Sequence, residues 1–155
     1  MIAIQETAID ACQLTRDLEN RSSGFGATVT FTGTMRELST NQNTLKALYL
    51  EHYPIMTERS LTDLLAQATE RFGLLDATLV HRVGTILPDE PIVYVAATSE
   101  HRQAAFDACQ MVMDYLKNYA PFWKKEIFTD GTELWVEQKD SDQHALQKWQ
   151  TKLKR

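Results

Sequence analysis

The sequence has few cysteines and no long apolar run, and each shortage excludes a class of protein. Its 155 residues include two cysteines, Cys12 and Cys109, which lie far apart and form no CxxC pair. That spacing argues against a disulfide framework and a zinc site, so we expect no metal. The longest apolar runs, such as 92–97, are far shorter than the roughly 20 residues that span a bilayer. No basic region precedes the first apolar residues, so we expect a cytoplasmic protein that binds no membrane.

The charge balance contains no basic excess. The formal net charge is −5, from 16 Lys and Arg against 21 Asp and Glu. Proteins that bind nucleic acid by neutralising phosphate usually carry a clear positive excess, so we expect no nucleic-acid partner. A hydrophobic content of 43% with 24% charged residues is ordinary for a globular protein. We therefore predict a single domain over 1–155, in which any basic cluster is local.

Hydrophobic periodicity predicts an order of strands and helices. Apolar residues at one-face spacing predict helices, and segments that are rich in Thr, Val and Phe or alternate in polarity predict strands. The predicted elements are a helix over 6–20, strands over 26–35 and 45–53, a helix over 56–72, strands over 77–87 and 92–98, a helix over 100–118, a hairpin over 127–136 and a terminal helix over 141–155, with 140–155 expected to fray. The polar stretch 37–43 is predicted to be a mobile loop. This order favours an α+β domain with helices packed on a largely antiparallel sheet.

Both long predicted helices have recognisable ends. Thr57 can cap the start of the earlier one, and Gly73 stands where a helix end favours a left-handed residue. Pro121 forbids a regular continuation of the later helix. Cys109 falls on the apolar face of that helix, so we predict that it belongs to the core and is not a nucleophile.

Three lysines gather around the proline break. Lys117, Lys124 and Lys125 lie within nine residues, next to Phe122 and Trp123. An ammonium beside aromatic rings is partly desolvated, which lowers its pKa toward a range where it exchanges protons. The same three cations make a ready anion site. The alternative is that they are solvated surface lysines whose stems cover the aromatic rings.

A second candidate anion site lies at the start of the helix predicted over 100–118. His101 and Arg102 fall in its first turn, just after Thr98 and Ser99. Unpaired N–H groups and the helix dipole favour an anion such as phosphate there. The alternative is a solvated arginine beside a histidine that caps the helix. By themselves these residues leave both interpretations open.

Six motifs in a fixed order carry more information than any single residue. They are Phe31-Thr32-Gly33-x-x-Arg36, Leu50-Glu51-His52-Tyr53-Pro54-x-Met56-Thr57-Glu58, His81-Arg82-x-Gly84, Ser99-x-His101-Arg102-x-x-x-Phe106, Met113-Asp114-Tyr115-Leu116-Lys117-x-x-Ala120-Pro121-Phe122-Trp123-Lys124 and Trp135-Val136-Glu137. Together they resemble the large, catalytic subunit of molybdopterin synthase, from about Val29 to Asp142. The resemblance implies an α/β hammerhead fold with a smaller α+β subdomain, which the predicted order of elements accommodates.

The resemblance also implies an activity. It points to an enzyme, a sulfurtransferase that converts cyclic pyranopterin monophosphate to molybdopterin without a cofactor. The implied sulfur donor is a small ubiquitin-like subunit whose C-terminal Gly-Gly carries a thiocarboxylate and enters the pocket of this chain as an extended tail. The family arrangement is a homodimer that binds two small subunits as a heterotetramer. Residues of both large subunits can complete one pocket in that arrangement.

Candidate site residues follow from the same resemblance. Lys117 and Lys124 match the two catalytic lysines of the family. The positions that match substrate-binding residues are Thr34, Met35, Arg36, His101, Arg102, Lys117, Lys124, Lys125 and Glu126. Many family members carry a basic residue where this chain has Thr34. Because side chains alternate along an extended segment, Lys124 and Lys125 are expected to point to opposite sides.

Four polar residues embedded in predicted strands are left out of the site. Buried polar side chains need hydrogen-bond partners more often than they perform chemistry. These residues are Glu51, His52, His81 and Arg82.

Two functions from other classes fit the same basic residues. A noncatalytic module would bind an anionic or phosphorylated ligand through the Lys and Arg cluster without turnover. A ligand-sensing α+β domain would use the helix N-terminus as an effector site and regulate a partner. Only the enzyme requires a small protein that ends in Gly-Gly, so such a partner discriminates between these functions.

Overall fold

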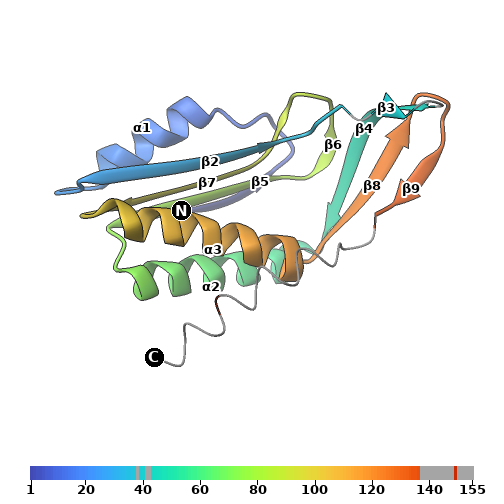
Figure 1. The fold of residues 1–155 in the computed structure, drawn as a ribbon. Helices are drawn as coiled ribbons and strands as arrows, with labels where there is room; N and C mark the ends of the chain where they lie inside the picture. The colour runs from blue at the N-terminus through green and yellow to red at the C-terminus, as the bar shows by residue number, and fades with distance from the viewer. Residues whose placement is uncertain (38, 41–42, 137–148, 150–155) are drawn as a thin grey trace.

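The computed structural model describes residues 1–37, 39–40, 43–136 and 149. Two sheets make up the fold, with helices on both faces of the first (Figure 1). The elements in chain order are β1 (Ile2–Gln5), α1 (Ala11–Arg21), β2 (Ala27–Thr34), β3 (Ser39–Thr40), β4 (Asn43–His52), α2 (Pro54–Phe72), β5 (Asp76–Arg82), β6 (Gly84–Ile86), β7 (Pro91–Ser99), α3 (Arg102–Tyr119), β8 (Phe122–Phe128) and β9 (Glu133–Trp135). Among the helices so described, none is long and apolar enough to cross a membrane.

The first sheet has the strand order β1-β5-β7-β2. β1 pairs with β5 in parallel, whereas β5 and β2 both run antiparallel to β7. Figure 1 shows α1 on one face of this sheet and α2 and α3 on the other. Because helices cover both faces, β5 and β7 are buried along most of their length.

Neighbouring residues of β5 and β7 pack into two separate cores. Leu79 and Val95 belong to the cluster that contains the apolar faces of α2 and α3. The next residues in alternation, Val80 and Tyr94, belong to the cluster with Leu18 of α1. This arrangement follows from the period-two alternation of side chains along a strand.

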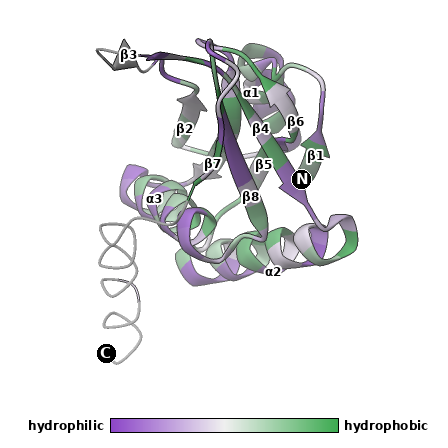
Figure 2. Cartoon of the chain, turned by 90° about the vertical axis from the view of Figure 1, so that its right-hand side faces the viewer, coloured by the Kyte–Doolittle hydropathy of each residue, from purple (hydrophilic) through white to green (hydrophobic). Residues whose placement is uncertain are grey.

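The second sheet contains β3, β4, β8 and β9 in that order, and β6 also pairs with β4. All of these pairs are antiparallel. Met35, Leu48, Leu50 and Ile86 belong to a third core cluster, which packs on one face of this sheet. Figure 2 shows a hydrophilic stretch along β8. The predicted α+β class, with packed helices and largely antiparallel pairing, is confirmed.

The N-terminal segment differs from the helix predicted over 6–20. Residues Ile2–Gln5 form β1, which the sequence pattern did not predict, and α1 begins only at Ala11. Asp10 is the N-cap, and its side chain accepts a hydrogen bond from the Gln13 N–H at 2.9 Å. Because the cap fixes the start of the helix, the residues before it are available to pair with β5.

α2 begins two residues earlier than predicted. Pro54 occupies its first turn, where the fixed φ of proline suits a helix. The missing N–H costs nothing there, because N–H groups of the first turn have no partner within the helix. Thr57 is therefore not the N-cap. Its side chain is buried, and its hydroxyl donates to the Pro121 carbonyl at 3.5 Å. Gly73 ends the helix with φ 60, as predicted.

Two predicted strand boundaries were wrong because the pairing partners are distant in sequence. The strand predicted over 77–87 is interrupted before Gly84, whose φ is 76, so β5 pairs in the first sheet and β6 in the second. β8 begins at Phe122, well before the predicted hairpin, because its first residues pair with β4. Within the predicted loop 37–43, Ser39–Thr40 form β3, and the rest of that loop lies partly outside the described residues.

The predicted terminal helix over 141–155 lies outside the described residues except for Trp149. The Trp149 side chain is fully buried against α2 and α3. Its indole N–H donates to the Asp114 carboxylate at 2.7 Å, and its ring meets Phe72 edge-on with centroids 6.0 Å apart. The Arg71 guanidinium lies over the ring and donates to the Trp149 carbonyl at 3.2 Å. Trp149 therefore packs into the core that α2 and α3 share.

Replacing Trp149 with alanine is therefore expected to destabilise the protein strongly. Removing a large buried aromatic side chain costs about 3 to 5 kcal/mol, and here the Asp114 carboxylate also loses its donor. Urea unfolding of Trp149→Ala measures the loss. Trp135→Ala is the matched control, because Trp135 is 54% exposed and its loss is expected to cost less than about 1 kcal/mol. Equal unfolding free energies for the two variants would contradict this packing.

His81 joins the two sheets. It lies on β5 in the first sheet, and its ring stacks on Phe122 of β8 in the second, with centroids 3.9 Å apart and planes inclined by 15°. The His81 Nδ1–H donates to the Arg82 carbonyl at 2.8 Å. Burial lowers the pKa of His81 from 6.5 to about 4, against the smaller opposing effect of that hydrogen bond, and His52 lowers it slightly further. The buried ring is therefore neutral near pH 7.

The depressed pKa of His81 predicts a loss of stability in acid. The unfolded chain takes up a proton at His81 from about pH 6.5 downward, whereas the folded chain resists it until about pH 4. The contribution of His81 to the unfolding free energy is complete above pH 6.5 and falls as the pH drops through this window. From about pH 7 to about pH 4, the parent is expected to lose about 3 kcal/mol more unfolding free energy than His81→Phe. Denaturant titrations at both pH values test this, and equal losses would contradict it.

Candidate active site

The end of α3 and the start of β8 bring two predicted lysines to one turn. α3 ends two residues after Lys117, where Pro121 stops the helix as predicted. The Phe122 N–H then donates to the Ala120 carbonyl at 2.8 Å, which makes a tight turn into β8. Lys117 is exposed in the last helical turn, where a cation suits the helix dipole. Lys124 is half-buried in β8, so the two lysines flank this turn.

Lys124 and Lys125 lie on opposite faces of β8, as predicted. Lys124 pairs across to Leu50 of the third core cluster, whereas Lys125 pairs with Tyr49. The Lys125 Nζ makes an ion pair with Glu133 at 2.8 Å and lies 5.4 Å from the centroid of the Tyr49 ring. The hydrogen bond to Glu133 raises the pKa of Lys125. Lys125 is thereby favoured as a fixed positive charge over a proton-transfer group.

Glu126 shares a face of β8 with Lys124. Side chains two residues apart on a strand point to the same side. Glu126 pairs with Leu48 of β4 and with Leu134 of β9, and it is half-buried like Lys124. This face therefore carries one cation and one carboxylate beside apolar residues of β4.

The end of β2 holds Thr34, Met35 and Arg36. Thr34 follows a break in the register with β7, and its side chain is exposed like that of Arg36. Met35 is buried in the third core cluster. Its N–H and its carbonyl both bond to the turn before β7, at 3.0 and 2.9 Å. The backbone of Met35, a position that the resemblance matches to a substrate-binding residue, is thus engaged within the fold.

His101 and Arg102 stand at the other end of α3. The helix begins at Arg102, so His101 is the N-cap and does not belong to the first turn, contrary to the prediction. The Ser99 hydroxyl donates to the His101 carbonyl at 2.7 Å. Gly26 is required beside this segment, because a Cβ there would collide with the Glu100 carbonyl. The first turn contains no acidic residue, so its N–H groups and the two exposed basic residues favour an anion.

One chain does not bring all the predicted residues together. Arg102 and Lys117 occupy opposite ends of α3, roughly 22 Å apart at about 1.5 Å per residue. Figure 1 shows the end of α3 beside β8 and its start at the far end of the first sheet. The substrate that the resemblance implies, a pterin with one phosphate, is much shorter than this distance. The predicted residues therefore form separate groups within one chain.

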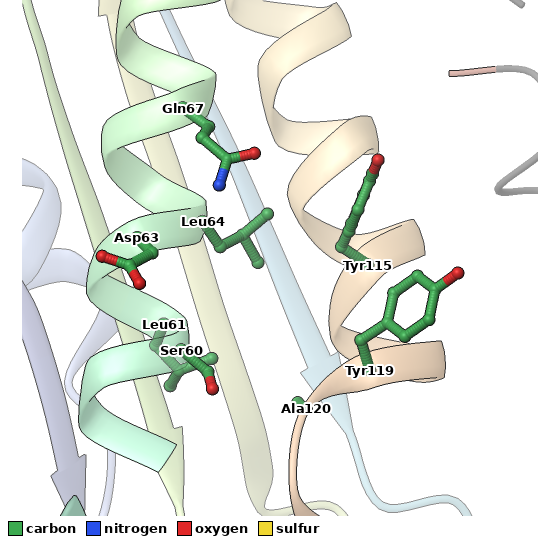
Figure 3. A pocket seen from close by; sticks show the side chains of 8 residues that line it. All are labelled: Ser60, Leu61, Asp63, Leu64, Gln67, Tyr115, Tyr119 and Ala120. Carbon is green, nitrogen blue, oxygen red and sulfur yellow. The ribbon is translucent and has the colours of Figure 1, made fainter. Parts of the chain in front are cut away.

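A hollow of about 260 Å³ lies between α2 and α3 (Figure 3). Ser60, Asp63 and Gln67 of α2 line one side of it, and Tyr115 and Tyr119 of α3 line the other. It borders the end of α3, but none of its lining residues is among the candidate site residues. The hollow is therefore a different feature from the lysine turn.

The two cysteines lie away from this turn. Cys109 is buried on α3, which confirms its predicted place in the core. Burial raises the pKa of Cys109 to about 12, so its thiol stays protonated and donates to the Val29 carbonyl at 3.5 Å. Cys12 is exposed on α1, across the first sheet from α3. Among the residues that the structure describes, no three His, Cys, Asp or Glu side chains could hold a metal ion.

Sequence reasoning did not connect His81 with the lysine turn. The apolar run Thr78-Leu79-Val80 before it indicates burial, so its structural role could be inferred. Its stacking partner, Phe122, lies far away in sequence on a strand whose start was predicted too late. No local pattern carries that contact.

Known proteins resemble this chain in sequence and in structure. The family model described as MoaE protein matches residues 4–119. A relative from Pseudomonas aeruginosa, named molybdopterin synthase catalytic subunit, is 46% identical over 149 residues, which are 96% of this chain and 98% of the relative. A molybdopterin biosynthesis MoaE protein from Burkholderia ambifaria is 43% identical, with a TM-score of 0.82 over 97% of each chain.

A more distant solved structure agrees with these relatives. Molybdopterin synthase from Staphylococcus aureus is 29% identical, with a TM-score of 0.78 over 86% of this chain and 95% of the other. Identity, coverage and fold thus agree along nearly the whole chain. The chain therefore belongs to the MoaE protein family, whose relatives described above include a molybdopterin synthase catalytic subunit.

Proposed function

We propose that this chain is the sulfur-transferring catalytic subunit of a molybdopterin synthase. It acts on cyclic pyranopterin monophosphate and installs the two sulfurs of the molybdopterin dithiolene. The observation that carries the proposal is the turn at Pro121, which Lys117 and Lys124 flank from a helix end and a strand start. Family membership supports the reaction. A single domain in the cytoplasm belongs to the same proposal.

The sulfur comes from a partner. The Cys109 thiol is buried and protonated, and Cys12 lies across the first sheet from α3. Neither thiol is positioned to deliver sulfur at the lysine turn. We therefore assign the donor to a small ubiquitin-like subunit, whose C-terminal Gly-Gly thiocarboxylate enters beside Phe122, Lys124 and the β8–β9 hairpin. The name catalytic subunit, carried by the Pseudomonas relative, fits an enzyme with a second subunit.

The two lysines perform the chemistry in this proposal. Lys117 and Lys124 orient the thiocarboxylate, transfer protons and stabilise the negative charge that develops during transfer. Lys124 is half-buried beside apolar residues of β4, where a charge interacts more strongly than in water. Glu126 lies on the same face and can hold the ammonium in place. Lys125 contributes fixed positive charge from the other face.

The substrate anion binds at the start of α3 in a second chain. His101 and Arg102 stand at a helix N-terminus that favours phosphate, but they lie roughly 22 Å from Lys117 in the same chain. In the proposed twofold dimer, the start of one α3 lies beside the end of the other. Arg36, with Thr34 nearby, completes the pterin side of the pocket, and the buried Met35 between them holds this segment in the fold. Two small subunits on this dimer make a heterotetramer.

Alanine substitutions at the lysines test the catalytic assignment. Lys117→Ala and Lys124→Ala are each expected to lower single-turnover sulfur transfer at least about a hundredfold, the range for losing an acid–base or charge-stabilising group. Stability is expected to change by less than about 1 kcal/mol, because Lys117 is exposed and Lys124 half-exposed. Lys125→Ala is expected to lose less activity, since it removes an ion pair on the other face of β8. The assay uses the thiocarboxylated small subunit and the cyclic pyranopterin.

If correctly folded Lys117→Ala and Lys124→Ala proteins react as fast as the parent, the lysine cluster is only a binding surface. The chain would then be a noncatalytic anion-binding module.

Mixed dimers test whether one pocket uses two chains. Arg102→Ala and Lys117→Ala homodimers are each expected to be inactive. Random reassociation of the two variants makes half of the dimers mixed, and each mixed dimer then has one intact pocket, so about a quarter of the parent activity is expected to return. Arg102→Ala mixed with itself is the control. No recovery in a mixture whose mixed dimers are verified by differential tags would contradict the two-chain pocket.

A further inference from the structure

A stacked pair of rings holds the start of β8 against the first sheet. The His81 ring of β5 and the Phe122 ring of β8 are nearly parallel, with centroids 3.9 Å apart. His52 also faces Phe122, but its ring is 6.2 Å away and tilted by 32°, so it does not stack. The His81 ring is therefore the flat surface on which Phe122 rests.

The orientation of the His81 ring is itself fixed. Its Nδ1–H donates to the Arg82 carbonyl at 2.8 Å, which sets the tautomer, and burial of the ring holds its plane. His81 is buried and neutral near pH 7, so the ring presents an uncharged face to Phe122. A buried ring with a fixed plane restricts the direction from which its partner can approach.

Phe122 determines how the next residues of β8 are presented. It is the first residue of the strand, and its N–H closes the tight turn onto Ala120 at 2.8 Å. Phe122 lies opposite His52, and Lys124 lies opposite Leu50. Residues two apart on a strand share a face, so the Phe122 and Lys124 side chains point to the same side.

We propose that His81 is a positioning residue for sulfur transfer, because its ring, stacked on Phe122, fixes the face and direction in which β8 presents Lys124. The inference rests on the proposed function and adds to it a residue that touches no substrate. The stack joins the two sheets at the strand that carries Lys124. A displacement of about 1 Å at a reacting group can cost up to a hundredfold in rate, so the positioning is kinetically significant.

Two substitutions at His81 separate the stack from the hydrogen bond. His81→Phe keeps a ring for Phe122 but removes the Nδ1–H donor. His81→Asn keeps an N–H donor near the same place but removes the ring. Phe122→Leu removes the stack from the other side and preserves an apolar side chain. Tyr53→Leu is the matched control, because it removes the Tyr53–Trp123 ring contact, 5.0 Å between centroids, at the neighbouring residue of β8.

Each variant is assayed as the complex with the thiocarboxylated small subunit. His81→Asn and Phe122→Leu are expected to lower kcat at least about tenfold, with KM for the cyclic pyranopterin changed less than about threefold. The double variant His81→Asn with Phe122→Leu is expected to have a kcat no lower than that of the more impaired single variant, because both substitutions remove the same contact. His81→Phe and Tyr53→Leu are expected to stay within about threefold of the parent.

Hydrogen exchange of the β8 amides is a readout that does not depend on activity. Faster exchange in β8 is expected for His81→Asn and Phe122→Leu, and parent-like exchange for His81→Phe. The inference is overturned if His81→Asn keeps the parent kcat, or if the kcat of His81→Phe falls as far as that of His81→Asn. If the parent itself transfers no sulfur, the proposed function fails. The exchange comparison still decides whether the stack holds β8, and unchanged exchange in both variants overturns the inference.

Discussion

The proline at position 121 is the constraint on which the arrangement of this chain depends. It ends α3 on the first sheet and sends the chain into β8 of the second, so a helix end and a strand start meet at one turn. Three contacts hold that turn: the Thr57 hydroxyl on the Pro121 carbonyl, the Phe122 N–H on the Ala120 carbonyl and the His81 ring on Phe122. Contacts from α2, α3, β5 and β8 therefore all help to position the turn that Lys117 and Lys124 flank.

The two faces of β8 carry lysines with different surroundings. One face presents Lys124 and Glu126 beside apolar residues of β4, and the other presents Lys125 in an ion pair with Glu133. The hydrogen bond to Glu133 raises the pKa of Lys125 and so fixes its charge, whereas Lys124 lies beside apolar residues of β4. The neighbouring residues Lys124 and Lys125 thus have different chemical surroundings although both are lysines. This difference supports a catalytic group on one face and an electrostatic one on the other.

The length of α3 accounts for the proposed need for two chains. The helix separates its basic N-terminus from Lys117 by roughly 22 Å, so the groups proposed to bind phosphate and to transfer sulfur cannot meet on one small substrate within one protomer. The hollow between α2 and α3 does not bring these groups together, because the candidate residues do not line it. A dimer that pairs opposite ends of α3 would make activity depend on assembly, and a monomer would bind anions without turnover.

The sequence alone determined the α+β class, the core place of Cys109, the stop at Pro121 and the opposite faces of Lys124 and Lys125. Each of these follows from local periodicity, residue geometry or strand alternation, which neighbouring residues encode. Only the tertiary structure decided that Ile2–Gln5 is a strand, that Gly84 divides one predicted strand between two sheets and that His81 stacks on Phe122. It also decided the burial of Trp149. These features depend on partners far away in the chain, and no local pattern specifies which distant strand or helix a segment will meet.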